Sequence, residues 1–414
     1  MARWRRAAWA VLGLVALVLA LAALVAWLNR DTELPTADTP PIPDAVARGA
    51  YLARLGNCAG CHTARGGRPY AGGRGLVTPF GTVYAGNLTP DPLTGLGQWS
   101  ADDFWRALHL GRSRDGRLLT PAFPYTEFTQ VMRPDSDALF AYLRSLAPVV
   151  QPNRPHELRF PYNTQAAQAV WRALFFRPAS FRPEPLRPAE WNRGAYLVRG
   201  LGHCAACHAP RNALGATQDP EALAGGHVPM QPWFAPALGL AGLPPRAQAD
   251  LVALLKTGTW AGGTAIGPMA EVVFNSTQHW TETDLQAVAL YLQDLPAAPA
   301  AGSAGAAPAE QMALGAQLYT RHCADCHGAR GEGVPGAYPP LAGNPSVQQA
   351  TPTNLIQVVL HGGFAPATAG NPRPYGMPPT PLQDAEIAAL LSYVRQSWGG
   401  SAAAVSALDV VKLR

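Results

Sequence analysis

The chain has 414 residues, which is too long for one ordinary domain and suits about three domains of roughly 100–200 residues each. Hydrophobic residues make up 48% of it, enough to fill folded cores, and the 41 glycines and 41 prolines follow no period, which excludes a collagen-like chain. The formal net charge of +5 is spread along the sequence. That distribution is typical of a solvated surface, and we expect no nucleic-acid partner.

Residues 1–30 predict a membrane anchor. Arg3, Arg5 and Arg6 precede an uncharged apolar run from Ala7 to Leu28, which as a helix would measure roughly 33 Å and cross a hydrocarbon core of about 30 Å. A cleaved signal peptide has a shorter apolar region and a small-x-small cleavage site, and this run has no good site. We therefore favour an uncleaved anchor, with its arginines cytoplasmic, over a cleaved signal. Both alternatives deliver the rest of the chain to the periplasmic side.

The motif Cys-x-x-Cys-His occurs three times and uses all six cysteines of the chain. Two thiols about one helical turn apart can add to the two vinyl groups of one haem, and the following histidine can bind its iron. The sequence therefore predicts three covalently attached haem c groups. Their attachment residues and proximal ligands are Cys58, Cys61 and His62; Cys204, Cys207 and His208; and Cys323, Cys326 and His327.

Two other uses of paired cysteines fit this pattern less well. A structural zinc site takes four ligands, usually as two nearby pairs, whereas these pairs lie far apart in the chain and each has its own histidine. A thioredoxin-like Cys-x-x-Cys follows a strand in a βαβ pattern, and no such pattern is visible. Covalent haem attachment is the interpretation that accounts for all three motifs.

The sequence around the motifs is also repeated. The stretch W-N-R-G-A-Y-L-V-R-G-L-G-H-C at 191–204 is similar to A-R-G-A-Y-L-A-R-L-G-N-C at 47–58. In each repeat a helix leads into the motif, a middle helix ends at a glycine, and a terminal helix contains a tyrosine. The middle helices are predicted at 102–110, 250–257 and 354–361, and the terminal helices at 135–146, 284–295 and 385–398. The predicted fold is all-α, with three tandem cytochrome c-type domains after an N-terminal transmembrane helix.

The predicted domain boundaries follow from these repeats and from composition. Residues 151–190 are rich in proline but also in aromatic side chains, so we expect a strap packed on the domains, with a short helix over Thr164–Phe175. The segments are the anchor 1–30, an extended spacer 31–43, domain 1 at 44–150, the strap 151–190, domain 2 at 191–298, an Ala/Gly/Pro linker 299–308, domain 3 at 309–399 and an unassigned tail 400–414.

An iron that only transfers electrons needs a second axial ligand, and methionine closes it to substrates and raises its potential. Met377 lies in the loop Y-G-M-P-P shortly before the last helix, where a distal ligand is expected. Met269 has the corresponding place in the second domain, with Met230 as its competitor. Met312 precedes its motif on a helix and is expected in the core.

The first domain departs from this pattern. Phe123 stands where the methionine is expected and cannot bind iron, and Met132 is the methionine of this domain. We favour Met132 as the ligand over an open iron bound by water or histidine. His109, on the middle helix, is expected to be a surface or packing residue, and His156 in the strap is a weak candidate.

The sequence resembles the triheme cytochrome c subunits of membrane-bound periplasmic dehydrogenases, over about Val46 to Trp398. The most specific stretches are T-P-F-G-T at 78–82 through N-L-T-P-D at 87–91, residues 191–212, and R-Q-S-W at 395–398. Members of that family accompany flavin-dependent gluconate, sorbitol and fructose dehydrogenases, PQQ-containing alcohol dehydrogenases and molybdenum-containing aldehyde dehydrogenases. The resemblance implies axial ligation by His62, His208 and His327, with Met269, Met377 and Met132 on the opposite sides.

The function implied by the resemblance is electron transfer from a dehydrogenase catalytic subunit to ubiquinone or a terminal oxidase, with no substrate chemistry in this chain. The haem domains would lie on the periplasmic side of the inner membrane. Family members are often exported by a cleaved signal, and the long apolar N-terminal run departs from that. Two alternatives stay open: a cytochrome c subunit of a terminal oxidase or other respiratory complex, and a multihaem peroxidase that uses an open first iron. No nucleotide-binding motif is present.

Overall fold

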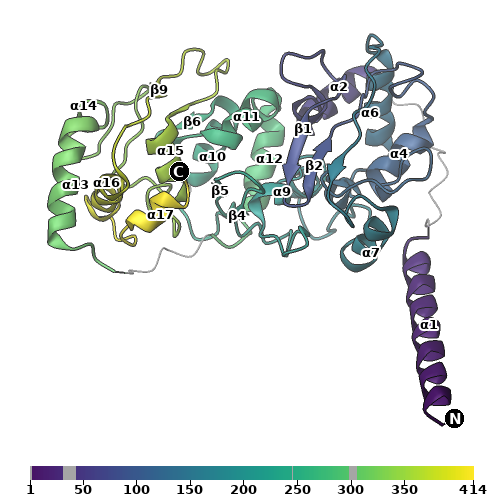
Figure 1. Ribbon diagram of the computed structural model, residues 1–414. Coiled ribbons are helices and arrows are strands. Elements are labelled where there is room, and N and C mark those ends of the chain that lie inside the picture. Colours follow the sequence, from purple (N-terminus) through teal and green to yellow (C-terminus); the bar gives the residue numbers. More distant parts are fainter. Residues whose placement is uncertain (1, 31–42, 245, 298–304) are drawn as a thin grey trace. The chain divides into compact units, whose positions relative to one another are not determined.

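The computed structural model describes residues 2–30, 43–244, 246–297 and 305–414 (Figure 1). It contains two compact units, Met1–Gly49 with Ala64–Phe181, and Ala50–Thr63 with Arg182–Arg414. Both are mainly helical, as predicted, with short antiparallel strand pairs that were not predicted. The predicted spacer 31–43 and linker 299–308 fall largely outside the described residues.

The chain begins with the long helix α1 (Ala2–Leu28). The elements up to the strap are α2 (Ala45–Leu55), α3 (Cys58–His62), β1 (Gly75–Thr78), β2 (Gly81–Tyr84), α4 (Ala101–Leu110), α5 (Tyr125–Phe128), α6 (Arg133–Ser145), β3 (Glu157–Leu158) and α7 (Gln165–Phe175). β2 pairs with both β1 and β3, with Val77 opposite Thr82 and Gly81 opposite Leu158.

The remaining elements all belong to the second unit. They are α8 (Ala189–Arg199), α9 (Ala205–His208), β4 (Gly226–His227), β5 (Phe234–Ala235), α10 (Arg246–Thr257), β6 (Thr259–Trp260), β7 (Gly263–Thr264), α11 (Gly267–Asn275), the 3₁₀ turn η1 (Thr277–His279), α12 (Glu282–Leu292), α13 (Ala309–His322), α14 (Ala324–His327), α15 (Thr353–His361), β8 (Gly363–Phe364), β9 (Gly376–Met377), α16 (Asp384–Gln396) and α17 (Ala407–Val411). Every helix predicted for the repeats is therefore present, with ends shifted by a few residues.

A close helix crossing recurs in each repeat. A Cβ atom at Gly49, Gly194 or Gly315, on the helix that leads into the motif, would collide with a backbone carbonyl oxygen and with a tyrosine Cβ of the terminal helix. The partners are Ala138 and Tyr142, Ala287 and Tyr291, and Ala389 and Tyr393. A residue without a side chain lets two helix backbones approach this closely. The recurrence supports three structurally equivalent repeats.

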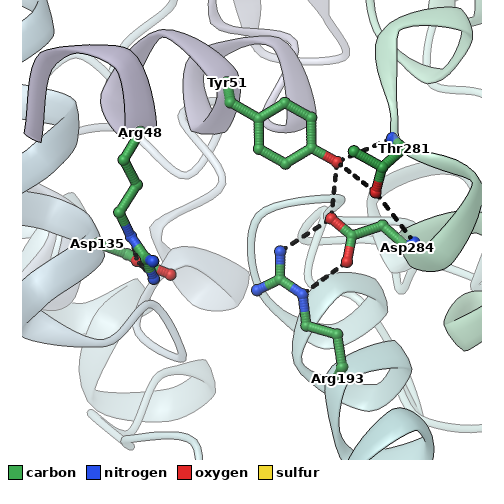
Figure 2. Close-up of polar contacts among 6 residues, drawn as sticks. All are labelled: Arg48, Tyr51, Asp135, Arg193, Thr281 and Asp284. Atoms are coloured by element: carbon green, nitrogen blue, oxygen red, sulfur yellow. Dashed lines mark hydrogen bonds and ion pairs between the residues drawn. The ribbon is translucent and has the colours of Figure 1, made fainter. Parts of the chain in front are cut away.

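An ion pair accompanies this crossing in the first two repeats (Figure 2). Arg48 contacts Asp135 within the first unit, with Nε 2.8 Å from Oδ1, and Asp135 is fully buried. In the second unit, Nε and Nη2 of Arg193 donate to the two carboxylate oxygens of Asp284 at 2.8 and 2.9 Å. The third repeat has Leu314 in place of the arginine.

The Asp284 carboxylate predicts acid sensitivity. Burial raises its pKa, but the hydrogen bonds from Arg193 and Tyr51 outweigh this and hold the pKa below its usual value of 3.8. A depressed pKa stabilises the fold above the unfolded pKa, and this contribution is lost as the pH falls through the folded pKa. We expect Asp284→Asn to cost about 2 kcal/mol at neutral pH, and this cost to decrease only as the pH falls below 3.8 and through the lower folded pKa. Urea unfolding at neutral and acidic pH measures the free energy of unfolding of the variant and the wild type. A difference between the two proteins that does not change with pH would contradict this role of Asp284.

The strap and the tail both pack against the domains beside them. Residues 151–181 of the strap belong to the first unit, where Phe176 and Trp171 stand edge-on to the buried ring of Tyr125. This packing confirms the predicted helix and explains the aromatic residues of the strap. In the tail, Ala402, Val405 and Val410 are buried, and the buried guanidinium of Arg395 donates to three backbone carbonyls, those of Val347, Gln349 and Ala403.

Candidate functional site

Each Cys-x-x-Cys-His motif forms one short helical turn directly after the first helix of its repeat. α3 begins at Cys58, and α9 and α14 begin just after Cys204 and Cys323. Burial raises the pKa of the Cys58 and Cys204 thiols to about 12 and that of Cys323 to about 11. Reactive and metal-binding cysteines have lowered thiol pKa values instead. Among the described residues, no three His, Cys, Asp or Glu side chains form a cluster suited to a metal ion.

The second and third motif histidines have the same backbone contact. His208 Nδ1 lies 2.7 Å from the carbonyl oxygen of Pro236, and His327 Nδ1 lies 2.9 Å from that of Pro339. Burial lowers the pKa of both rings, so each is neutral and donates Nδ1–H to its carbonyl. The lone pair is then on Nε2, which is the atom an axial haem ligand presents, with its tautomer fixed by the second nitrogen. These residues therefore fit haem c.

The loop that orients His208 also contacts the helix of Met269. This loop comprises residues 226–236, and a Cβ atom at Gly267, the first residue of α11, would collide with the Trp233 ring. Met269 lies in the first turn of α11 and is half-buried. Its competitor Met230 is 57% exposed and has a left-handed backbone conformation, with φ of 54°. The packing therefore favours Met269 over Met230 as the candidate ligand of the second repeat.

The third motif has an equivalent arrangement. Tyr338 directly precedes Pro339, whose carbonyl contacts His327. Its ring packs on the ring of Tyr375, with 5.2 Å between centroids. Tyr375 is two residues from Met377, which lies on β9 opposite Gly363. In both repeats, therefore, one loop contacts the proximal histidine and the segment of the candidate methionine. Met312 lies on α13, apart from this loop.

The two candidate ligands of the first iron belong to different units. His62 belongs to the second unit and Met132 to the first, and ligation by this pair stays a prediction. Met132 caps the N-terminus of α6 and is 38% exposed. Phe123 packs on Phe128, with ring centroids 5.4 Å apart.

The two other histidines considered for the first iron have structural partners. His109 is buried and stacks on Trp105 at 4.5 Å between ring centroids, and burial lowers its pKa. The Nδ1 atom of His156 accepts a hydrogen bond from the backbone N–H of Tyr84 on β2. His109 is therefore a packing residue, and the exposed His156 is a hydrogen-bond partner of the β2 backbone.

A contact between the first two motifs was not predicted. His203, immediately before Cys204, places Nε2 3.3 Å from the carbonyl oxygen of Gly56, two residues before Cys58. Beside it, Trp280 Nε1 donates to Ser276 Oγ at 3.1 Å, and that hydroxyl donates to the Leu55 carbonyl at 3.1 Å. The first two attachment turns are thus joined through hydrogen bonds, all within the second unit.

Tyr51, one turn before Leu55 on α2, joins the same two repeats (Figure 2). Its hydroxyl donates to Asp284 Oδ2 at 2.7 Å and accepts from the backbone N–H of Thr281 at 3.0 Å. The repeated G-A-Y sequence contains this tyrosine, but its partners lie more than two hundred residues away and left no local signal.

The third repeat is joined to the second through Asn354 of α15. Its side-chain amide accepts from the Phe234 backbone N–H at 2.9 Å and donates to the Phe234 carbonyl at 2.8 Å. Phe234 is two residues from Pro236, which orients His208. Thr368 Oγ1 adds a hydrogen bond to the Thr257 carbonyl at 2.9 Å.

We expect His203→Ala to weaken the association of the first two attachment turns. The Gly56 carbonyl would lose a buried partner, at a cost of about 1–3 kcal/mol. The excitonic Soret circular dichroism of neighbouring haems depends on their separation and orientation, so we expect its amplitude to fall, with recovery in His203→Gln. His322 is the matched control, because it also directly precedes a motif cysteine and is exposed. An equal change in His322→Ala would argue against this role.

Comparison with known proteins agrees with this geometry. Residues 312–398 match the family model for cytochrome c. The motifs and this match define a c-type cytochrome that binds haem c. The cytochrome c subunit of the quinone alcohol dehydrogenase of Gluconacetobacter polyoxogenes is 39% identical, over 91% of this chain and 86% of the relative. The gluconate 2-dehydrogenase cytochrome c subunit of Pantoea cypripedii is 37% identical, over 89% of each.

The chain belongs to the family of dehydrogenase cytochrome c subunits, as the resemblance predicted. Its members are electron-transfer subunits rather than catalytic ones. One of the subunits of the nicotinate dehydrogenase of Pseudomonas putida is 43% identical over 84% of this chain, which covers 30% of that longer protein.

Proposed function

We propose that this protein is a triheme cytochrome that conducts electrons from a periplasmic dehydrogenase to ubiquinone or a terminal oxidase. The observation that supports it best is that hydrogen bonds join the first two attachment segments to each other and the second repeat to the third. His203 joins the first motif to the second, and Asn354 joins the loop that orients His208 to the third repeat. Cofactors held by directly bonded segments keep fixed separations, which electron transfer over short distances requires.

Haem c, when attached, supplies a one-electron Fe(III)/Fe(II) couple at each motif. In this proposal the six cysteines would bind three haems covalently, and His62, His208 and His327 would each bind an iron. Met269 and Met377 would supply a second ligand to two of the irons and exclude water. Met132 has this role in the first domain. The backbone carbonyls of Pro236 and Pro339 orient two of the histidines and raise their basicity.

The partner is a dehydrogenase catalytic subunit of the flavin, PQQ or molybdenum type, acting on a sugar acid, polyol, alcohol or aldehyde. The support is that the relatives are named as subunits of alcohol, gluconate, fructose and nicotinate dehydrogenases. On the same basis, the partner's possible substrates include a nicotinate-like heterocycle.

The proposed location is the inner membrane, with the haem domains on the periplasmic side. α1 is long and apolar enough to cross a bilayer, although a signal sequence near the N-terminus would satisfy the same criteria. Its ends favour an anchor, because Trp4 and Trp9 near one end and Trp27 at the other are exposed, as in the aromatic belts of spanning helices. An anchored carrier stays beside the quinone pool.

The test is substrate-dependent haem reduction in a tagged protein isolated from detergent-solubilised native membranes. Gluconate, sorbitol, fructose, ethanol, an aldehyde and nicotinate are offered in turn, and the reduced c-haem absorption band is followed. We expect one of them to reduce the haems and a catalytic subunit to co-purify, with three haems per chain by intact mass. Isolation with an oxidase, and no reduction by any substrate, would contradict the dehydrogenase partner.

A further inference from the structure

Three apolar residues of α7 are exposed on one side of the helix. Ala166, Val170 and Leu174 are exposed at a spacing of four residues, with exposed fractions of 46% for Val170 and 60% for Leu174. This spacing places all three on one side of the helix. In α12, by contrast, the exposed positions are Glu282, Thr283 and Gln286, as expected for a helix that faces water.

Two of the three polar residues of α7 point inward, and the third, the exposed Gln165 in the first turn, hydrogen-bonds to the Leu118 backbone. Gln168 and Arg172 are both buried. Gln168 donates to the Tyr162 carbonyl at 2.9 Å, and the Arg172 guanidinium contacts Asn29 and the Leu110 carbonyl. The helix thus buries Gln168 and Arg172 together with Ala173 on its inner side and still leaves Val170 and Leu174 exposed, which is not expected of a helix whose outer side faces water.

The C-terminal end of α1 is fixed to this helix. Asn29 Nδ2 donates to the Ala169 carbonyl at 2.9 Å, and Arg172 Nε donates to Asn29 Oδ1 at 2.9 Å. Arg112 Nη2 donates to the Asn29 carbonyl at 2.8 Å. α1 and α7 belong to one compact unit and contact each other (Figure 1). The depth of α7 in a membrane is therefore set by the point where α1 leaves it.

We propose that the α7 face, formed by Ala166, Val170 and Leu174, lies in the boundary between headgroups and acyl chains of the bilayer that α1 crosses. This inference rests on the proposed membrane anchor. Continuity with α1 identifies the lipid as the occupant, because Trp27, two residues before Asn29, is the aromatic residue expected at that boundary. The exposed Arg30 and Arg177 are placed to meet lipid phosphates. The first unit is then held directly on the membrane by α7.

The experiment uses the full-length holoprotein in nanodiscs of phosphatidylethanolamine and phosphatidylglycerol doped with a lipid that has a diazirine near the glycerol. After illumination, lipid adducts are mapped by peptide mass spectrometry. We expect adducts on α1 and on α7, and none above background around Leu93, which is 86% exposed in the same unit. Adducts on α1 without adducts on α7 would overturn the inference and leave the anchor intact. Absence of adducts on α1 would overturn the anchor and the inference together.

A paired variant tests the assignment of the face. Val170→Glu with Leu174→Glu places two charges in the boundary, and we expect roughly tenfold fewer adducts on α7 with those on α1 unchanged. The matched control is Leu93→Glu with Val150→Glu, at two other exposed apolar positions of the first unit, which we expect to leave the α7 adducts unchanged. All four substitutions are on the surface, and an unchanged Soret absorbance per chain verifies folding. Equal loss of α7 adducts in both variants would contradict the proposal.

Discussion

Replacing Met377 by histidine is expected to lower the midpoint potential of the proposed third haem, by a fraction of the ~0.8 V range that all axial-ligand types together span. A thioether stabilises Fe(II), whereas a second imidazole stabilises Fe(III). Met377 is held on β9 against Gly363, so the substitution changes the ligand without removing the loop. Potentiometric titration with optical detection measures the effect, together with the loss of one methionine-to-iron charge-transfer band.

The matched control for this prediction is Met312→Leu. Met312 lies on α13 of the same repeat and is not proposed as a ligand, so the three potentials should be unchanged. The same titration of Met230→Leu and Met269→Leu distinguishes the two candidates of the second repeat. A potential that moves with Met230 but not with Met269 would refute the assignment that packing favours.

The second large effect is expected for Gly194→Leu. A Cβ atom there would collide with the Ala287 carbonyl and with Tyr291 Cβ, and neither backbone nor buried ring can yield without separating α8 from α12. We expect a loss of at least about 3 kcal/mol, together with failure to retain the second haem, because α8 leads directly into Cys204. Urea unfolding and haem content per chain measure the two effects.

Gly13→Leu serves as the control for this steric argument. Gly13 is also helical, but a Cβ atom there meets nothing within 4 Å, and leucine is compatible with the apolar helix α1. We expect normal haem content and stability in this variant. If Gly194→Leu retained wild-type stability, the close crossing of α8 and α12 would be wrong, and with it the structural equivalence of the three repeats.

The sequence alone determined the features that local chemistry encodes. The motif spacing predicted the attachment turns, because two cysteines three positions apart share one helical turn. Apolar periodicity and terminal glycines predicted the middle and terminal helices, and their tyrosines at 142, 291 and 393 occupy equivalent crossings in the structure. The apolar run at the N-terminus predicted α1 by its length and composition.

Only the tertiary structure decided how the repeats connect and which residues support the proximal histidines. The carbonyls of Pro236 and Pro339 follow their histidines at different distances along the chain, 28 and 12 residues, so no fixed spacing reveals them. His203 and Gly56 are 147 residues apart, and a backbone carbonyl acceptor leaves no mark on residue type. Likewise, a helix was predicted over Thr164–Phe175, but which of its sides faces outward is decided by the burial of Arg172, whose partners lie far away in sequence.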